Sequence, residues 1–139
     1  MINTFSEQIE FEYDDTKQLS EWIEQCSKMH NKELGDINII FCSDDYLYEM
    51  NKIYLSHDYY TDVITFPYNI GNKIEGDIFI SIDRVKDNAK TYNTSFENEL
   101  NRVIIHGVLH LIGFKDKSEE EQKEMRKQED TCLEKLKEK

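Results

Sequence analysis

The residues best suited to chemistry are two histidines, His106 and His110, which lie four positions apart. On an α-helix this spacing places both side chains on one face, where two imidazoles can bind one metal ion. Gly113 follows them, and a glycine can end a helix in a left-handed turn and reverse the chain. That reversal would bring Asp116 to the same ion as a third ligand. Three protein ligands and one open position are typical of a hydrolytic metal site.

Each of these residues also has a simpler explanation. Two histidines can be hydrogen-bonded core residues, but on an otherwise apolar helix a shared ion would satisfy both imidazoles at once. Asp116 can be an acid in a turn between Lys115 and Lys117. The spacing His-x3-His-x2-Gly-x2-Asp favours a ligand, because it matches the extended zincin pattern of a helix, a glycine turn and a returning third ligand.

The residue after the first histidine bears on the type of hydrolysis. Metalloproteases of the His-Glu-x-x-His type carry their general base at that position. Here the position is Gly107, which has no side chain to act as a base. A zinc peptidase is therefore disfavoured.

A second group of candidates occupies residues 57–62, with the sequence His-Asp-Tyr-Tyr-Thr-Asp. This segment is either an ordinary polar loop or the rim of a substrate site, where Tyr59 and Tyr60 would stack on bases. Asp77 is similarly open to two interpretations. It either caps the end of a strand or lies near the metal as a supporting carboxylate.

Hydrophobic periodicity predicts the elements that position these residues. Alternating or apolar runs predict strands at residues 9–13, 37–42, 63–66 and 76–82, the last two forming a hairpin. Helical spacing and cap residues predict helices from about residue 16, after Ser43, at 83–92, from a capping box that opens at Thr94, and after Ser118. The apolar helix at 103–112 should be buried on most sides. The sequence thus predicts an α+β fold, a small mixed β-sheet packed with helices that include a central buried metal-binding helix.

Length and composition fit this architecture. A chain of 139 residues predicts one domain over residues 1–139, and 38% hydrophobic with 33% charged residues predicts a soluble globular protein. No apolar run approaches the ~20 residues of a membrane span, and the first residues do not resemble a signal peptide. Cys26, Cys42 and Cys132 lie at apolar positions, which predicts buried thiols and fits a cytoplasmic location.

The charge is strongly negative and unevenly distributed. A net charge of −12 argues against loose, charge-driven binding to nucleic acid. Residues 1–62 carry 14 acids and 4 bases, whereas residues 63–139 carry 15 acids and 13 bases. The excess acid therefore lies away from the histidines along the chain, and the final helix reads as a thin apolar stripe with a solvated face of Glu and Lys.

Three segments together resemble the YbeY family of metal-dependent endoribonucleases. They are residues 61–67 (Thr-Asp-Val-Ile-Thr-Phe-Pro), 76–81 (Gly-Asp-Ile-Phe-Ile-Ser) and 106–114 (His-Gly-Val-Leu-His-Leu-Ile-Gly-Phe), in the family's order. The resemblance implies a zincin-like fold, one Zn²⁺ per chain and cleavage of single-stranded RNA. It further implies a role in ribosomal RNA maturation and ribosome quality control, with ribosomal or other single-stranded RNA and the ribosome or its assembly factors as partners.

The resemblance also assigns site residues and reveals two departures. His106 and His110 match the family's first two ligands, and Asp116 falls where a third histidine is usual. Leu55 stands where many members have an arginine that matters for activity, so either another residue supplies the cation that would steady a phosphate or catalysis is weaker. With His106 and His110 as the catalytic ligands, the candidates for binding substrate are Tyr60, Thr61, Asp62, Asp77, Arg102, Lys115 and Lys117.

Two mechanistic questions stay open in the sequence. Asp62 and Asp77 are the candidates for a general base, and neither is favoured. The alternative function is that of a ribosome-assembly factor with a mainly structural metal and little nuclease activity, which Leu55 and the acidic charge favour.

Overall fold

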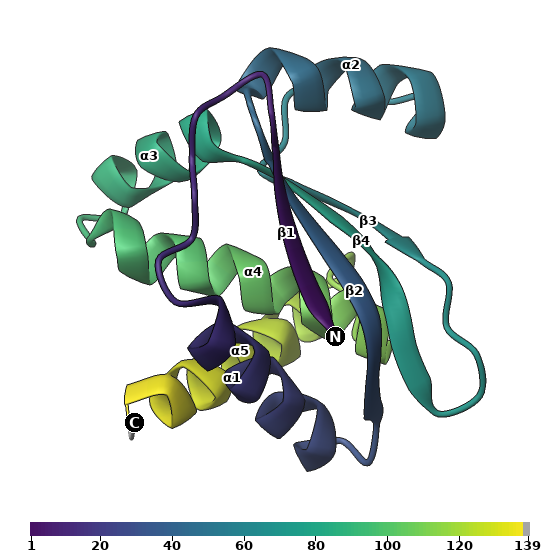
Figure 1. Cartoon of the computed structure of the whole chain (residues 1–139). Coiled ribbons are helices and arrows are strands. Elements are labelled where there is room, and N and C mark those ends of the chain that lie inside the picture. Colours follow the sequence, from purple (N-terminus) through teal and green to yellow (C-terminus); the bar gives the residue numbers. More distant parts are fainter. Residues whose placement is uncertain (138–139) are drawn as a thin grey trace.

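A computed structural model of the chain, described here over residues 1–137, has the predicted α+β architecture (Figure 1). Its elements in chain order are β1 (Ile2–Glu7), α1 (Thr16–Met29), β2 (Glu33–Cys42), α2 (Asp44–Leu55), β3 (Val63–Pro67), β4 (Lys73–Ser81), α3 (Ile82–Thr91), α4 (Phe96–Ile112) and α5 (Glu119–Lys137). The strands form a mixed sheet in the order β1-β2-β4-β3. β2 pairs in parallel with β1 and β4, and the predicted hairpin makes β3 an antiparallel edge strand.

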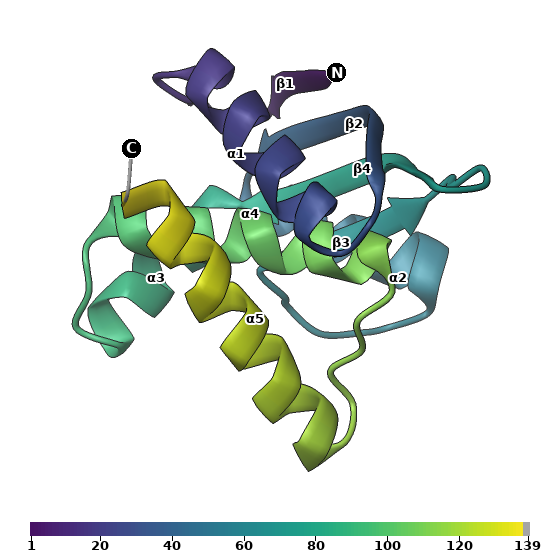
Figure 2. The same ribbon diagram turned by 90° about the horizontal axis from the view of Figure 1, so that it is seen from below.

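The two faces of the sheet have different partners. Side chains alternate along β4, so Ile78 and Ile80 belong to the main core together with residues of α1, α4 and α5. The opposite face carries Phe79, which packs in a smaller cluster with Leu47 of α2. Figures 1 and 2 show α1, α4 and α5 gathered on one side of the sheet and α2 apart from them. This alternation decides which polar side chains can reach the histidine helix.

α4 is the central buried helix that its composition predicts. Its buried residues are Glu99, Leu100, Asn101, Val103, Ile104, Ile105, Gly107, Val108, Leu109 and Leu111. Gly107 faces β4 so closely that a Cβ atom there would lie 2.8 Å from Cγ2 of Ile78. The absence of a side chain at this position therefore lets the helix approach the sheet. The N-cap is Ser95 and not Thr94, one residue later than predicted.

One predicted strand is wrong. Residues 9–13 form no strand, and the N-terminal strand is β1, which ends before Gln8 adopts a φ of 57°. Ile9, Phe11 and Tyr13 nevertheless pack against the main core. The alternating pattern at 9–13 thus reflects one buried side of an extended segment that no neighbouring strand pairs with.

Two smaller predictions from the sequence, a capping box before α5 and buried cysteines, agree with the structure. The capping box at the start of α5 is reciprocal, because Ser118 Oγ accepts from the Glu121 amide while Glu121 accepts from the Ser118 amide. Cys26, Cys42 and Cys132 are buried free thiols, as predicted. Within residues 1–137, no helix is both long and apolar enough to cross a membrane.

Candidate functional site

The side chains of His106, His110 and Asp116 meet at one point beside α4. The two Nε2 atoms of the histidines are 3.0 Å apart. The Oδ2 atom of Asp116 lies 3.2 Å from Nε2 of His106 and 3.3 Å from Nε2 of His110. We call these three residues the triad. All three are partly exposed, so the point where they meet is open to solvent.

The end of α4 explains how Asp116 reaches the histidines. Gly113 has a φ of 125°, which an L-residue with a side chain rarely adopts, and its amide bonds to the carbonyls of Leu109 and His110. The Phe114 amide then bonds to the Leu109 carbonyl, which completes a tight reversal of the chain. The predicted glycine turn is therefore present, and it returns the chain along the face that carries the histidines.

The hydrogen bonds behind the triad leave its inner atoms as acceptors. Nδ1 of His110 lies 3.0 Å from the Phe114 carbonyl, and Nδ1 of His106 lies 2.6 Å from Oε2 of Glu129. A carbonyl and an ionised carboxylate can only accept, so each Nδ1 donates and each neutral ring presents a lone pair on Nε2. Two such lone pairs and a carboxylate facing one another are stabilised by a cation.

The size of the triad also suits a metal ion. Tetrahedral zinc with bonds of about 2.0–2.1 Å separates its ligand atoms by about 3.3 Å. The separations within the triad, 3.0, 3.2 and 3.3 Å, are close to this value. Two imidazoles and a carboxylate are ligands that zinc accepts, so the triad could hold a metal ion while leaving a position open.

Glu129 is a buried member of the site that the sequence reading missed. The residue is 5% exposed, although its helix, α5, has the sequence pattern of a thin apolar stripe and a solvated face of Glu and Lys. Arg102 donates to Oε1 of Glu129 at 2.9 Å, while His106 contacts the other oxygen. The only sequence signal is position: Glu129 lies four residues after Met125 and three before Cys132, so it falls on the apolar face of α5.

These contacts shift the pKa values of both Glu129 and His106. Burial alone would raise the pKa of Glu129, but the hydrogen bonds from His106 and Arg102 outweigh it and lower the pKa. Burial alone would lower the pKa of His106, but the bond to Glu129 and the charges of Glu129 and Asp116 outweigh it and raise the pKa. The carboxylate of Glu129 therefore stays ionised beside the ring.

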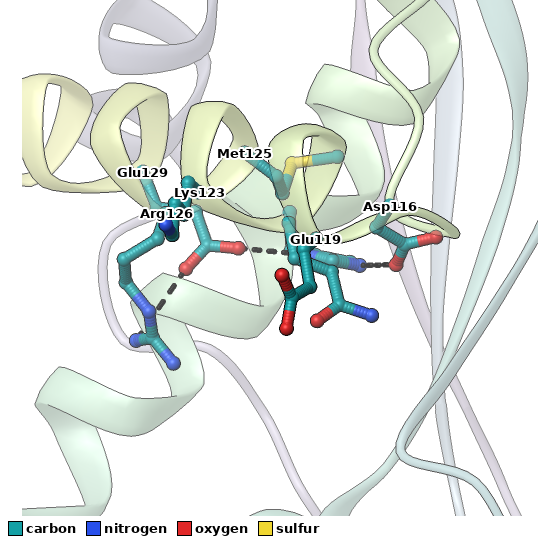
Figure 3. Close-up of a pocket in the computed structure, with 8 residues that line it drawn as sticks. Asp116, Glu119, Lys123, Met125, Arg126 and Glu129 are labelled. Carbon is teal, nitrogen blue, oxygen red and sulfur yellow. Dashed lines mark hydrogen bonds and ion pairs between the residues drawn. The ribbon is translucent and has the colours of Figure 1, made fainter.

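Two cavities open onto the triad from different sides. One, of about 660 Å³, runs along α5 and is shown in Figure 3. The other, of about 340 Å³, lies between α2, β3 and the triad. Both volumes are in the range of ligand-binding sites. His106 and Asp116 line both cavities, so the triad lies between two open approaches.

The cavity beside β3 contains part of the predicted rim. Its lining residues are Asn51, Leu55, His57, Tyr59, Thr61, Asp62, Val63, Ile64, Thr65 and the triad. The buried Asn51 donates to the Tyr59 carbonyl at 2.9 Å and so fixes the loop. Among the lining residues described, none is Lys or Arg. Leu55, at the position where an arginine is usual in the family that the sequence resembles, forms part of the wall.

Asp62 and Asp77, the two candidate bases, lie in different places. Asp62 lines cavities with His106 and Asp116, and burial raises the pKa of its carboxyl, which accepts from Asn88 at 3.2 Å. Asp77 is on the face of β4 opposite Ile78, and its carboxylate accepts from Asn38 and Tyr68. Of the two interpretations of Asp77, the position on this face of the sheet does not favour the one that places it near the histidines.

The ring of Tyr60, one of the two candidates for base stacking, is engaged by other side chains of the protein. One face of its ring stacks on Tyr48, with ring centroids 4.5 Å apart, and the Arg84 guanidinium lies 5.4 Å from the centroid of the Tyr60 ring. Its hydroxyl reaches Asp45 and not the triad. Of the two tyrosines, Tyr59 is the one that lines the cavity, where its ring stacks on His57.

The positively charged residues predicted to bind substrate lie outside the two cavities or are paired with acids. Lys115 and Lys117 are exposed on either side of Asp116 and do not line the two cavities, because alternation around Asp116 turns them outward. Arg102 lies beside the site but is engaged by Glu129 and Asp130. Lys123 and Arg126 of α5, which the sequence did not point to, line the larger cavity with His106 and Asp116.

Comparisons with known proteins agree on one family. A family model described as "Endoribonuclease YbeY" matches residues 1–137. A protein of that name from Christiangramia forsetii is 50% identical over 129 residues, which is 93% of this chain and 90% of the relative. Another from Flavobacterium johnsoniae is 48% identical over 130 residues, 94% of this chain and 93% of the relative. The solution structure of a Thermotoga maritima protein matches with a TM-score of 0.67 and 31% identity, and covers 98% of this chain and 89% of the other.

Proposed function

The chain belongs to the endoribonuclease YbeY family, and from this premise we propose that it is a zinc-dependent endoribonuclease specific for single-stranded RNA. Its substrate would be ribosomal RNA, and its role would be maturation of that RNA and quality control of ribosomes in the cytoplasm. The observation that carries the proposal is the meeting of three acceptor atoms, from His106, His110 and Asp116, between two open cavities.

The triad would hold one Zn²⁺. When bound, such an ion lowers the pKa of water towards ~7 and supplies positive charge to a scissile phosphate. Asp116 brings a negative charge where the family usually has a neutral histidine, so the site would be a weaker Lewis acid than one built from three histidines. His106 and His110 would hold the ion and so place it beside the substrate phosphate.

Other residues of the cavities would bind the RNA and move a proton. Asp62 is the better placed of the two candidate bases, because its carboxyl lies in the cavities shared with His106. Thr61 and His57 line the same space and offer hydrogen bonds to a phosphate or a ribose. Lys123 and Arg126 would supply the positive charge that Leu55 does not.

The test is cleavage by the purified chain with Zn²⁺ and a labelled single-stranded RNA. We expect internal cuts by the wild-type protein and none by His106→Ala. The ends of the products identify the nucleophile, because attack by the ribose 2′-hydroxyl passes through a cyclic phosphate and attack by water does not. If the wild-type protein cuts nothing that His106→Ala leaves intact, the nuclease proposal fails.

A second candidate function is that of a ribosome-assembly factor with a mainly structural metal. It is favoured by the cavity beside β3, whose described lining has no Lys or Arg, and by the overall charge of −12. This alternative predicts that Zn²⁺ raises the melting temperature and that the protein associates with ribosomal subunits, while single-stranded RNA stays intact. Cleavage by the wild-type chain in the same assay would exclude it.

A further inference from the structure

Glu129 is a charged residue in a buried position, which requires compensating interactions. It is 5% exposed and faces α4, whereas its neighbours Gln128 and Asp130 are more exposed. Burying a carboxylate costs free energy unless hydrogen bonds or opposite charges compensate for it. The nearest compensation for Glu129 comes from α4, through Arg102 and His106, which lie one helical turn apart on the same face. Arg126 on α5 adds a more distant ion pair, with Nη1 3.7 Å from Oε1 of Glu129.

The two oxygens of Glu129 have separate partners. Oε1 accepts from Nη1 of Arg102 at 2.9 Å, and this salt bridge orients the carboxylate. Oε2 lies 2.6 Å from Nδ1 of His106, which is short for a hydrogen bond and typical of a charge-assisted one. Figure 3 shows Glu129 and Asp116 on opposite sides of the cluster of side chains. Nδ1 of His106 bonds to Glu129, while its Nε2 atom faces Oδ2 of Asp116 at 3.2 Å.

The two histidines of the triad are therefore supported differently. His110 donates from Nδ1 to the backbone carbonyl of Phe114, which is a neutral acceptor, whereas His106 donates to an ionised carboxylate. A carboxylate behind an imidazole fixes its tautomer and orientation and makes the opposite nitrogen a stronger ligand. We therefore expect His106 to be the stronger metal ligand of the two histidines.

We propose that Glu129 is a positioning residue that holds His106 as the Nδ1-protonated tautomer, aims its Nε2 atom at the centre of the triad and strengthens metal binding there. The inference rests on the proposed function in one respect, namely that the triad binds a metal ion. Glu129 lines the larger cavity, but its two oxygens are engaged by Arg102 and His106 and do not reach the inner atoms of the triad, so we infer that it acts through His106.

The experiment measures the Zn²⁺ affinity of the purified chain by competition with a chromophoric chelator. Glu129→Gln keeps the shape of the side chain but loses the charge, and we expect Zn²⁺ to bind about 10- to 100-fold more weakly. The matched control is Asp130→Asn, which removes the other carboxylate on Arg102 without touching His106. Its affinity should stay within about 2-fold of the wild type, a smaller change than the loss of a partner behind a ligand causes.

Two further measurements separate positioning from folding. The imidazole ¹⁵N resonances of the metal-free protein should report a His106 ring with a proton on Nδ1, and Glu129→Gln should shift the populations of its tautomers. Glu129→Asp keeps the charge, so its affinity should fall between those of the wild type and Glu129→Gln.

The outcomes distinguish this inference from the proposed function. Wild-type affinity in Glu129→Gln, or an unchanged His106 tautomer, would overturn the inference and leave the metal site intact. A wild-type chain that binds no Zn²⁺ would overturn the proposed metal chemistry together with the inference. An equal loss of affinity in Asp130→Asn would also overturn the inference, because the effect would then belong to packing between α4 and α5.

Discussion

The Oδ2 atom of Asp116 lies 3.2 Å from Nε2 of His106, although Asp116 follows the end of the helix that carries His106. The positive φ of Gly113 permits the sharp return of the chain that makes this contact. A helix and the loop after it therefore act as one unit, with two imidazoles fixed on the helix and the carboxylate fixed by the turn. This relationship leads to the first prediction.

Removing the Asp116 carboxylate should weaken metal binding. We expect Asp116→Ala to retain much less Zn²⁺ per chain than the wild type, because two ligands hold zinc more weakly than three. Asp116→His should retain the ion, since a histidine also ligates zinc. Metal content after dialysis, measured by elemental analysis, checks both variants, with Lys115→Ala as the control. Asp116→Ala with wild-type metal content would remove Asp116 from the set of ligands.

The two candidate bases should behave differently. Asp62→Asn should lower the rate of RNA cleavage by about 10²- to 10⁴-fold, the usual contribution of a general acid or base, while metal content stays unchanged. Asp77→Asn should leave both quantities unchanged, because Asp77 lies on the opposite face of the sheet. Single-turnover cleavage rates with the zinc-loaded proteins check this pair. Equal rates for the two variants would contradict the assignment.

Gly107 should be sensitive to even the smallest side chain. Alanine favours a helix over glycine by about 1 kcal/mol, but overpacking a core costs about 1–3 kcal/mol. A Cβ atom at Gly107 would lie 2.8 Å from Cγ2 of the fully buried Ile78, so the packing cost should win. We expect Gly107→Ala to lower the free energy of unfolding by about 1 kcal/mol, measured by urea denaturation with a chelator present.

A double-mutant cycle tests the cause of that loss. Ile78→Ala removes the atoms that the new Cβ would meet, so Gly107→Ala should cost less in that background than in the wild type. Gly107→Ala that is as stable as the wild type, or more stable, would show that the helix can move away from the sheet. The close approach would then not explain the glycine.

Tyr13 should make the fold sensitive to alkaline pH. Burial, with the charges of Glu97, Asp15 and Asp14, raises the pKa of Tyr13 to about 12 from an ordinary value of 10. The neutral phenol is favoured in the folded state, so this stabilisation is fully present below pH 10 and is lost as the pH rises towards 12. The free energy of unfolding should therefore fall across that interval.

Tyr13→Phe isolates this contribution. The variant loses the 2.7 Å hydrogen bond from the phenol to Asn101, so it should be less stable at pH 8 by about 1 kcal/mol. The difference in unfolding free energy between the two proteins should shrink between pH 10 and pH 12. A constant difference over that range, in urea denaturation at each pH, would show that Tyr13 ionises equally in both states.

Much of the site was predictable because it is local in sequence. The spacing of His106 and His110, the glycine at 113 and the acid at 116 lie within one helix and its turn, whose geometry elementary rules describe. The buried character of α4 followed from its apolar composition, and the hairpin of β3 and β4 from two strand patterns with a loop between them. The strand expected at residues 9–13 failed, because alternation indicates one buried side and does not indicate a partner strand.

What tertiary structure decided is which distant groups meet the local motif. Glu129 comes from another helix, and nothing in its own segment distinguishes it from the many Glu and Lys around it until α5 packs on α4. Asp62 and Asp77 look alike in sequence, but Asp62, just before β3, lines a cavity with His106, whereas Asp77 lies on the face of β4 that points away from α4. The sequence by itself determined that the side chains of His106, His110 and Asp116 meet at one point. The packing of α5 and the pleat of β4 determined what supports them, because contacts between elements depend on faces and registers that local spacing does not encode.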